Sequence, residues 1–137
     1  SDAPFGGGMH HIEMPDADPT TDRKETRYFP LRLLLTDADR DGKPEVLTAS
    51  NREAAGRIFQ KFRSLGKGRM TRLAWNGLGL SPVWSTPSMG GRISDFAVGD
   101  VDNDGDDEMV IAVVSKEGDM ALTEARSSFV VYKQALH

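Results

Sequence analysis

The chain has 137 residues, a formal net charge of −4, and 38% hydrophobic and 28% charged residues, a composition typical of a globular domain. It contains no cysteine, which excludes disulfides, thiolate metal sites and cysteine nucleophiles. No apolar run approaches the roughly 20 residues that a membrane-spanning helix needs. The first residues carry no basic or apolar leader, so we expect any targeting signal of the natural protein to lie outside this sequence.

The N-terminal segment differs in composition from the rest of the chain. Residues 1–26 are rich in glycine, proline, aspartate and threonine, and we expect them to be irregular apart from one short strand at 10–14. Residues 28–35 are mainly apolar, as are residues 45–49, and an acidic loop separates the two segments. This pattern predicts two strands that form a hairpin closed by the loop.

A short helix is predicted between residues 51 and 66. Asn51 is suited to cap its N-terminus, Gly66 is suited to end it, and the apolar residues between them recur at helical spacing. Two further strands are predicted at 70–75 and 81–85, separated by the turn-forming pair Asn76-Gly77.

A second hairpin is predicted further along the chain. Residues 93–99 and 109–114 flank another acidic stretch, and residues 128–133 supply one more strand. Together, these elements predict an all-β protein with one short helical insertion.

The two acidic loops are copies of one pattern, Asp-x-Asp-x-Asp-Gly-x-x-Glu, which begins at Asp37 and again 63 residues later at Asp100. With their adjacent acids, the two stretches hold ten of the 21 acidic residues of the chain. Carboxylates at this density repel one another unless a cation lies among them. An internal repeat of this length, built from strands, is typical of propeller blades and other all-β arrays.

Calcium takes about six to eight oxygen ligands, and one short loop can supply most of them. Side chains at loop positions 1, 3, 5 and 9 can converge, position 7 contributes its carbonyl, and the glycine at position 6 permits the sharp turn. We therefore predict two Ca²⁺ ions. The predicted ligands are Asp37, Asp39, Asp41, Lys43 (through its carbonyl) and Glu45 for the first ion, and Asp100, Asp102, Asp104, Asp106 (through its carbonyl) and Glu108 for the second.

The loops do not fit an EF-hand, which needs glutamate at loop position 12, where this chain has Thr48 and Ile111. Magnesium is disfavoured as the ion, because it retains its water and seldom uses a full protein cage. A solvated turn without metal is the remaining alternative. The repetition of four carboxylates and a glycine at identical offsets argues against it.

Residues 99–112, preceded by Phe96, resemble the FG-GAP/VCBS repeat of integrin-α-like β-propellers. The first acidic loop matches this pattern less fully, and the resemblance covers about residues 28–136. It implies one four-stranded blade per repeat, with calcium bracing the hairpin between the first two strands. The expected organisation is an irregular segment at 1–26, a first blade at 27–90 and a second blade at 91–137.

The second repeat lacks a predicted fourth strand, so we expect the strand at 11–14, or a neighbouring chain, to complete that blade. Two blades cannot close a ring, since propellers have about four to eight. We therefore expect this chain to belong to a larger propeller, or to self-associate through its exposed blade edges.

No catalytic constellation is recognisable. His10 and His11 are adjacent and would point to opposite faces of a strand, and His137 is the only other histidine. The basic residues between Arg52 and Arg72 are interpreted as a solvated face rather than an anion-binding surface, so no nucleic-acid partner is expected.

The sequence thus predicts a non-catalytic, calcium-binding module that presents loops to a protein or glycan ligand. We expect it to be periplasmic, cell-surface or secreted, because extracellular modules bind calcium at roughly 10⁻⁴ to 10⁻³ M, which the cytosol could not saturate. The alternative is an accessory domain of a calcium-dependent enzyme whose catalytic part lies elsewhere.

Overall fold

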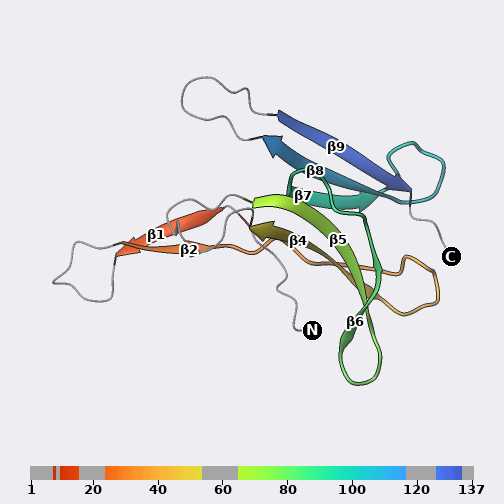
Figure 1. Cartoon of the computed structure of the whole chain (residues 1–137). Helices are drawn as coiled ribbons and strands as arrows, with labels where there is room; N and C mark the ends of the chain where they lie inside the picture. Colours follow the sequence, from red (N-terminus) through yellow and green to blue (C-terminus); the bar gives the residue numbers. More distant parts are fainter. Residues whose placement is uncertain (1–7, 9, 16–23, 54–64, 117–125, 134–137) are drawn as a thin grey trace.

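The computed structural model describes residues 8, 10–15, 24–53, 65–116 and 126–133. Every regular element in these ranges is a β-strand, and the nine strands form three antiparallel sheets (Figure 1). The predicted all-β class is therefore confirmed. Within the same ranges, no helix exists that could cross a membrane.

Strands β1 (His11–Pro15) and β2 (Lys24–Tyr28) form a sheet of their own, in which His11 lies opposite Tyr28. In Figure 1 this hairpin extends away from the other strands. The strand predicted at 10–14 is present, but its residues 11–14 do not complete the second blade, because they belong to this separate two-stranded sheet.

The four-stranded sheet has the spatial order β3-β4-β5-β6 and is formed by β3 (Leu34–Thr36), β4 (Glu45–Glu53), β5 (Leu65–Trp75) and β6 (Leu80–Ser85). The turn predicted at Asn76-Gly77 joins β5 to β6, and Gly77 has a φ of 95°. Strand β3 is shorter than the predicted run 28–35, because Tyr28 ends β2 and Pro30 has no N–H for a sheet.

The predicted helix at 51–66 is wrong at both of its ends. Asn51 belongs to β4, which continues to Glu53, and Gly66 lies inside β5. The physical reason at the first end is that the Asn51 side chain bonds to a distant strand instead of capping a helix. The middle of the predicted helix, residues 54–64, lies outside the described part of the chain.

The remaining sheet has the order β7-β8-β9 and is formed by β7 (Arg92–Gly99), β8 (Glu108–Lys116) and β9 (Arg126–Lys133). Over the described ranges it has three strands, so the expected pair of four-stranded blades is not observed. Strand β1, which we expected to be the fourth strand of this sheet, pairs with β2 instead.

The β3–β6 and β7–β9 sheets share one hydrophobic core. In β8, Met109, Ile111 and Val113 are buried while Val110 is only half-buried, which is the alternation of a strand with one face against a core. Each fully buried apolar side chain of this size contributes roughly 1.5–3 kcal/mol. The buried cluster contains Leu47, Ala49, Met70, Ile93, Phe96, Met109, Ile111 and Val113, which come from both sheets.

Polar links join the same two sheets. Asn51 Nδ2 donates to Ile93 O, and Ile93 N donates to Asn51 Oδ1, both at 2.8 Å. Nearby, Gly68 N donates to Gly91 O at 2.6 Å. A Cβ on Gly68 would lie 2.6 Å from Ile93 Cγ1, so the close approach of the strands requires glycine there.

Replacing Asn51 by alanine is expected to reduce the free energy of unfolding by about 2 kcal/mol, since two partly buried hydrogen bonds of about 1 kcal/mol each are lost. Urea denaturation measures this loss. Lys67→Ala, on the paired strand and exposed, is the control and is expected to change stability by less than about 0.5 kcal/mol. Equal stability of the Asn51 variant and the wild type would contradict the proposed link.

Candidate metal sites

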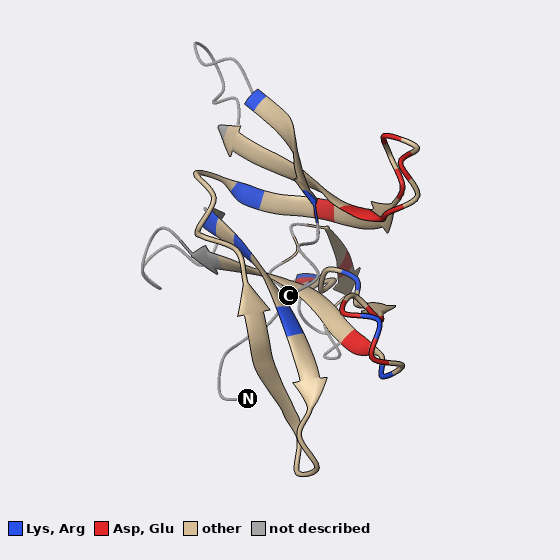
Figure 2. Ribbon diagram, turned by 90° about the vertical axis from the view of Figure 1, so that its right-hand side faces the viewer, with Lys and Arg blue, Asp and Glu red and all other residues tan. Residues whose placement is uncertain are grey.

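Each acidic loop closes a hairpin between two paired strands. The first loop joins β3 to β4, whose pairing ends at Thr36 opposite Glu45. The second joins β7 to β8, whose pairing ends at Gly99 opposite Glu108. The glutamate that ends each pattern is therefore fixed at the start of a sheet strand. Figure 2 shows both loops, with their acidic residues, on the same side of the molecule.

The two loops have the same backbone conformation. At position 4, Arg40 and Asn103 have φ values of 57° and 59°. At position 6, Gly42 and Gly105 have φ values of 84° and 93°. These left-handed conformations curl the chain inward, and they explain why position 6 is glycine in both copies.

The loops also share several of their internal hydrogen bonds. The first aspartate accepts from the backbone of the glycine, Gly42 N to Asp37 Oδ2 and Gly105 N to Asp100 Oδ2, both at 3.0 Å. The third aspartate accepts from the residue two positions on, at 2.8 Å for Asp41 Oδ1 and 3.0 Å for its counterpart in the second loop. The sequence repeat is thus also a repeat in geometry.

The last glutamate of each loop is buried. Glu45 is 5% exposed and Glu108 is 1% exposed. In each, Oε2 accepts a 3.1 Å hydrogen bond from the second residue of its own loop, Ala38 N or Val101 N. Glu108 Oε1 is also buried, but it accepts no hydrogen bond from any described residue. The nearest described cation is Lys133 Nζ at 3.9 Å, beyond hydrogen-bond distance, so the cost of burying this carboxylate oxygen is only partly offset.

The structure brings three carboxylates together in each loop. Oxygens of Asp37, Asp39 and Asp41 lie within 4.8 Å of one another, and so do oxygens of Asp100, Asp102 and Glu108. The other predicted carboxylate ligands, Glu45 in the first loop and Asp104 in the second, are not within these groups. They remain in the same loops, where Glu45 bonds to Ala38 N and Asp104 bonds to Asp106 N and to Lys133.

Lysines shift the pKa values of the third aspartates. The backbone N–H of Lys43, and then its side chain, lower the pKa of Asp41. The side chain of Lys133, and then the backbone N–H of Asp106, lower the pKa of Asp104. In return, hydrogen bonds to Asp102 and then Asp104 raise the pKa of Lys133, which is therefore charged at neutral pH.

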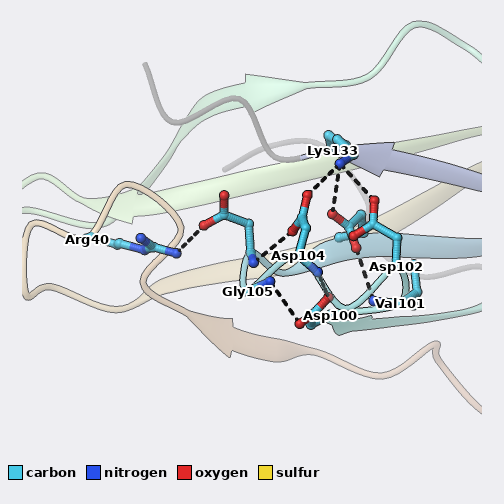
Figure 3. A network of polar contacts seen from close by, with 9 residues as sticks. Arg40, Asp100, Val101, Asp102, Asp104, Gly105 and Lys133 are labelled. Carbon is cyan, nitrogen blue, oxygen red and sulfur yellow. Dashed lines mark hydrogen bonds and ion pairs between the residues drawn. The ribbon is translucent and has the colours of Figure 1, made fainter.

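Two cations at the loops were not anticipated from the sequence. Lys133 Nζ lies 2.8 Å from Asp102 Oδ2 and 2.7 Å from Asp104 Oδ2 (Figure 3). Arg40 Nη2 lies 2.7 Å from Asp106 Oδ1 and so joins the first loop to the second. Of these two contacts, only that of Lys133 could have been predicted from the sequence. An antiparallel strand at 128–133 that pairs with the strand after the loop ends beside the loop.

The donor set of these loops fits a hard divalent cation. Several carboxylate oxygens converge on a short curled loop, and one of them, Glu108 Oε1, is buried without a hydrogen bond from the described residues. Calcium prefers flexible shells of such oxygens. Lys43 and Asp106 stand at loop position 7, and the role of their carbonyls as ligands remains a prediction.

A comparison with known protein families identifies a repeat in the region that contains the two acidic loops. The family model of the FG-GAP-like repeat matches residues 37–111, from the first aspartate of the first loop to the strand after the second. No curated protein and no solved structure gives a significant match. The resemblance to the FG-GAP repeat expected from the sequence is therefore confirmed, and the match indicates a repeat module of the β-propeller type. Since the match covers more than half of the chain, this protein belongs to the FG-GAP-like repeat family.

Proposed function

We propose that this chain is a non-catalytic, calcium-stabilised repeat module in which each acidic loop holds one Ca²⁺ ion. The observation that carries the proposal is the buried Glu108 carboxylate, whose Oε1 has no hydrogen-bond donor among the described residues. A divalent cation bound among the aspartates would balance that charge. The same glutamate recurs, also buried, in the first loop as Glu45.

The residues of each loop have separate tasks in this proposal. The glutamate, held at the start of β4 or β8 and bonded to the second loop residue, ties the ion to the sheet. The aspartates fold over it, and their backbone hydrogen bonds fix the loop beforehand, which lowers the entropy lost on binding. Bound calcium supplies the positive charge that removes the repulsion among the carboxylates.

The role we propose for the module is to present loops to a protein or glycan ligand at the cell envelope. The cell envelope is supported by the weak calcium affinity of such loops in extracellular modules, with dissociation constants of roughly 10⁻⁴ to 10⁻³ M. The cytosol could not saturate loops of this affinity. We also propose that outer faces are covered by further blades or a second copy. On β9, Phe129 is 78% and Val131 is 52% exposed, and covering these apolar side chains would be favourable.

Calcium titration by isothermal calorimetry tests the proposal. Two ions are expected to bind per chain, and Asp37→Asn and Asp100→Asn are each expected to remove one of them. Asp107→Asn is the matched control, since this aspartate lies within the second loop pattern but is not a predicted ligand. The proposal fails if the wild type takes up no calcium, or if the two loop variants still bind two ions.

A further inference from the structure

Lys133 lies at the end of β9, directly opposite Glu108 in the pairing of β8 with β9. Its side chain reaches over the second acidic loop (Figure 3). Nζ lies 2.8 Å from Asp102 Oδ2, 2.7 Å from Asp104 Oδ2 and 3.9 Å from the buried Glu108 Oε1. One ammonium group therefore contacts three of the carboxylates predicted to bind the second ion.

An ammonium group and a divalent cation compete for these carboxylates, because like charges a few ångströms apart repel. Calcium entering the second loop is therefore opposed by Lys133 Nζ. The lysine side chain is 65% exposed, and its flexible four-carbon chain can turn into solvent without disturbing the core.

The first loop lacks this arrangement. Val46 pairs with Leu73 in β4 and β5, and extending this register by one residue places Ala74 opposite Glu45. Residues opposite each other in an antiparallel pair project from the same face, so Ala74 occupies the place that Lys133 has in the second repeat. Its methyl group cannot reach an aspartate.

A lysine does contact the first loop, but in a different way. Lys43 belongs to the loop itself, is 83% exposed, and its Nζ pairs with Asp41 Oδ2 at 3.2 Å. The described ion pairs give it no second loop carboxylate. The two loops thus share their backbone conformation and differ in the cation that a neighbouring strand supplies.

We propose that Lys133 is a built-in competitor of calcium at the second loop. The lysine weakens calcium binding there, relative to the same loop without it, and keeps the loop ordered when calcium is scarce. As calcium rises, the ion takes over the carboxylates and the ammonium is released. This inference rests on the proposed function, because it concerns how one of the two calcium sites is regulated.

The main test is Lys133→Met in an Asp37→Asn background, in which only the second loop can bind. Removal of the competing charge is expected to lower the calcium dissociation constant about tenfold in calorimetry, because displacement no longer opposes binding. In the absence of calcium, the same variant is expected to melt at a lower temperature than its parent. Lys67→Met, an exposed lysine away from the loops, is the control and should change neither value.

The converse variant keeps the proposal testable should the first one fold poorly. Ala74→Lys in an Asp100→Asn background transfers the competitor to the first loop, and calcium binding there is expected to weaken several-fold. Unchanged affinities in both backgrounds, with calcium still bound, would overturn the role of Lys133 and leave the proposed function intact. If neither background nor the wild type binds calcium, the proposed function fails, and the competitor role fails with it.

Discussion

Saturating calcium is expected to raise the melting temperature of the calcium-free protein by about 10 °C or more. A ligand at about 100 times its dissociation constant adds about 2.7 kcal/mol of stability per site. Two sites would add roughly 5 kcal/mol, less the share spent on displacing Lys133. For a domain of this size, each kcal/mol corresponds to about 4 °C in melting temperature.

Thermal melting by circular dichroism, with calcium and with chelator, measures this shift. Magnesium at equal ionic strength is expected to give a much smaller effect, since it dehydrates reluctantly and prefers octahedral geometry. In a double variant, Asp37→Asn with Asp100→Asn, the calcium effect should nearly vanish. A wild-type melting temperature that chelator leaves unchanged would contradict the proposed function.

Ile111→Ala is expected to lower the free energy of unfolding by about 2–5 kcal/mol, the usual loss when a buried isoleucine side chain is truncated. Ile111 lies in β8, is 0% exposed, and belongs to the cluster that joins the β3–β6 and β7–β9 sheets. Because total stabilities are about 5–15 kcal/mol, the variant should lose a large part of its stability. The two sheets are expected to unfold together, since their core is shared.

Chemical denaturation followed by tryptophan fluorescence tests both expectations. Trp84 of β6 packs edge-on against Tyr132 of β9, with ring centroids 6.4 Å apart, so its signal reports whether the two sheets remain in contact. Trp75→Phe removes the other tryptophan. Leu78→Ala, at a side chain that is 96% exposed between β5 and β6, is the control and should change the free energy of unfolding little. Equal losses in the Ile111 and Leu78 variants would contradict the shared core.

Local patterns in the sequence were enough to place most strands and both loops. The loop geometry results from residues close in sequence, because the aspartates and the glycine of each loop bond to one another. The helix predicted at 51–66 is different, since its ends depend on contacts outside the segment. Its predicted cap, Asn51, is held by Ile93, and no local pattern reveals a partner that distant.

Contacts between separate segments account for the other differences. The strand at 11–14 pairs with β2, a neighbour in sequence that the expected blade pattern does not include. Lys133 reaches the second loop only through the register of β8 with β9. Arg40 reaches Asp106 only because the two loops lie on the same side of the molecule. The acidic residues were thus predictable as a group from local sequence, while the contacts of Lys133 and Arg40 with them depend on how separate segments are arranged.

The hydrogen bonds between Asn51 and Ile93 also make the two ends of the repeat pair different from each other. Its amide group offers one donor and one acceptor to Ile93, as the peptide group of an adjoining strand would. The residue 63 positions later is Val114, whose side chain has neither. A unit placed after the second repeat could not form the same pair of hydrogen bonds with residue 114. Head and tail of this pair are therefore not interchangeable, because a unit that follows the second repeat would have to be joined through contacts other than this amide.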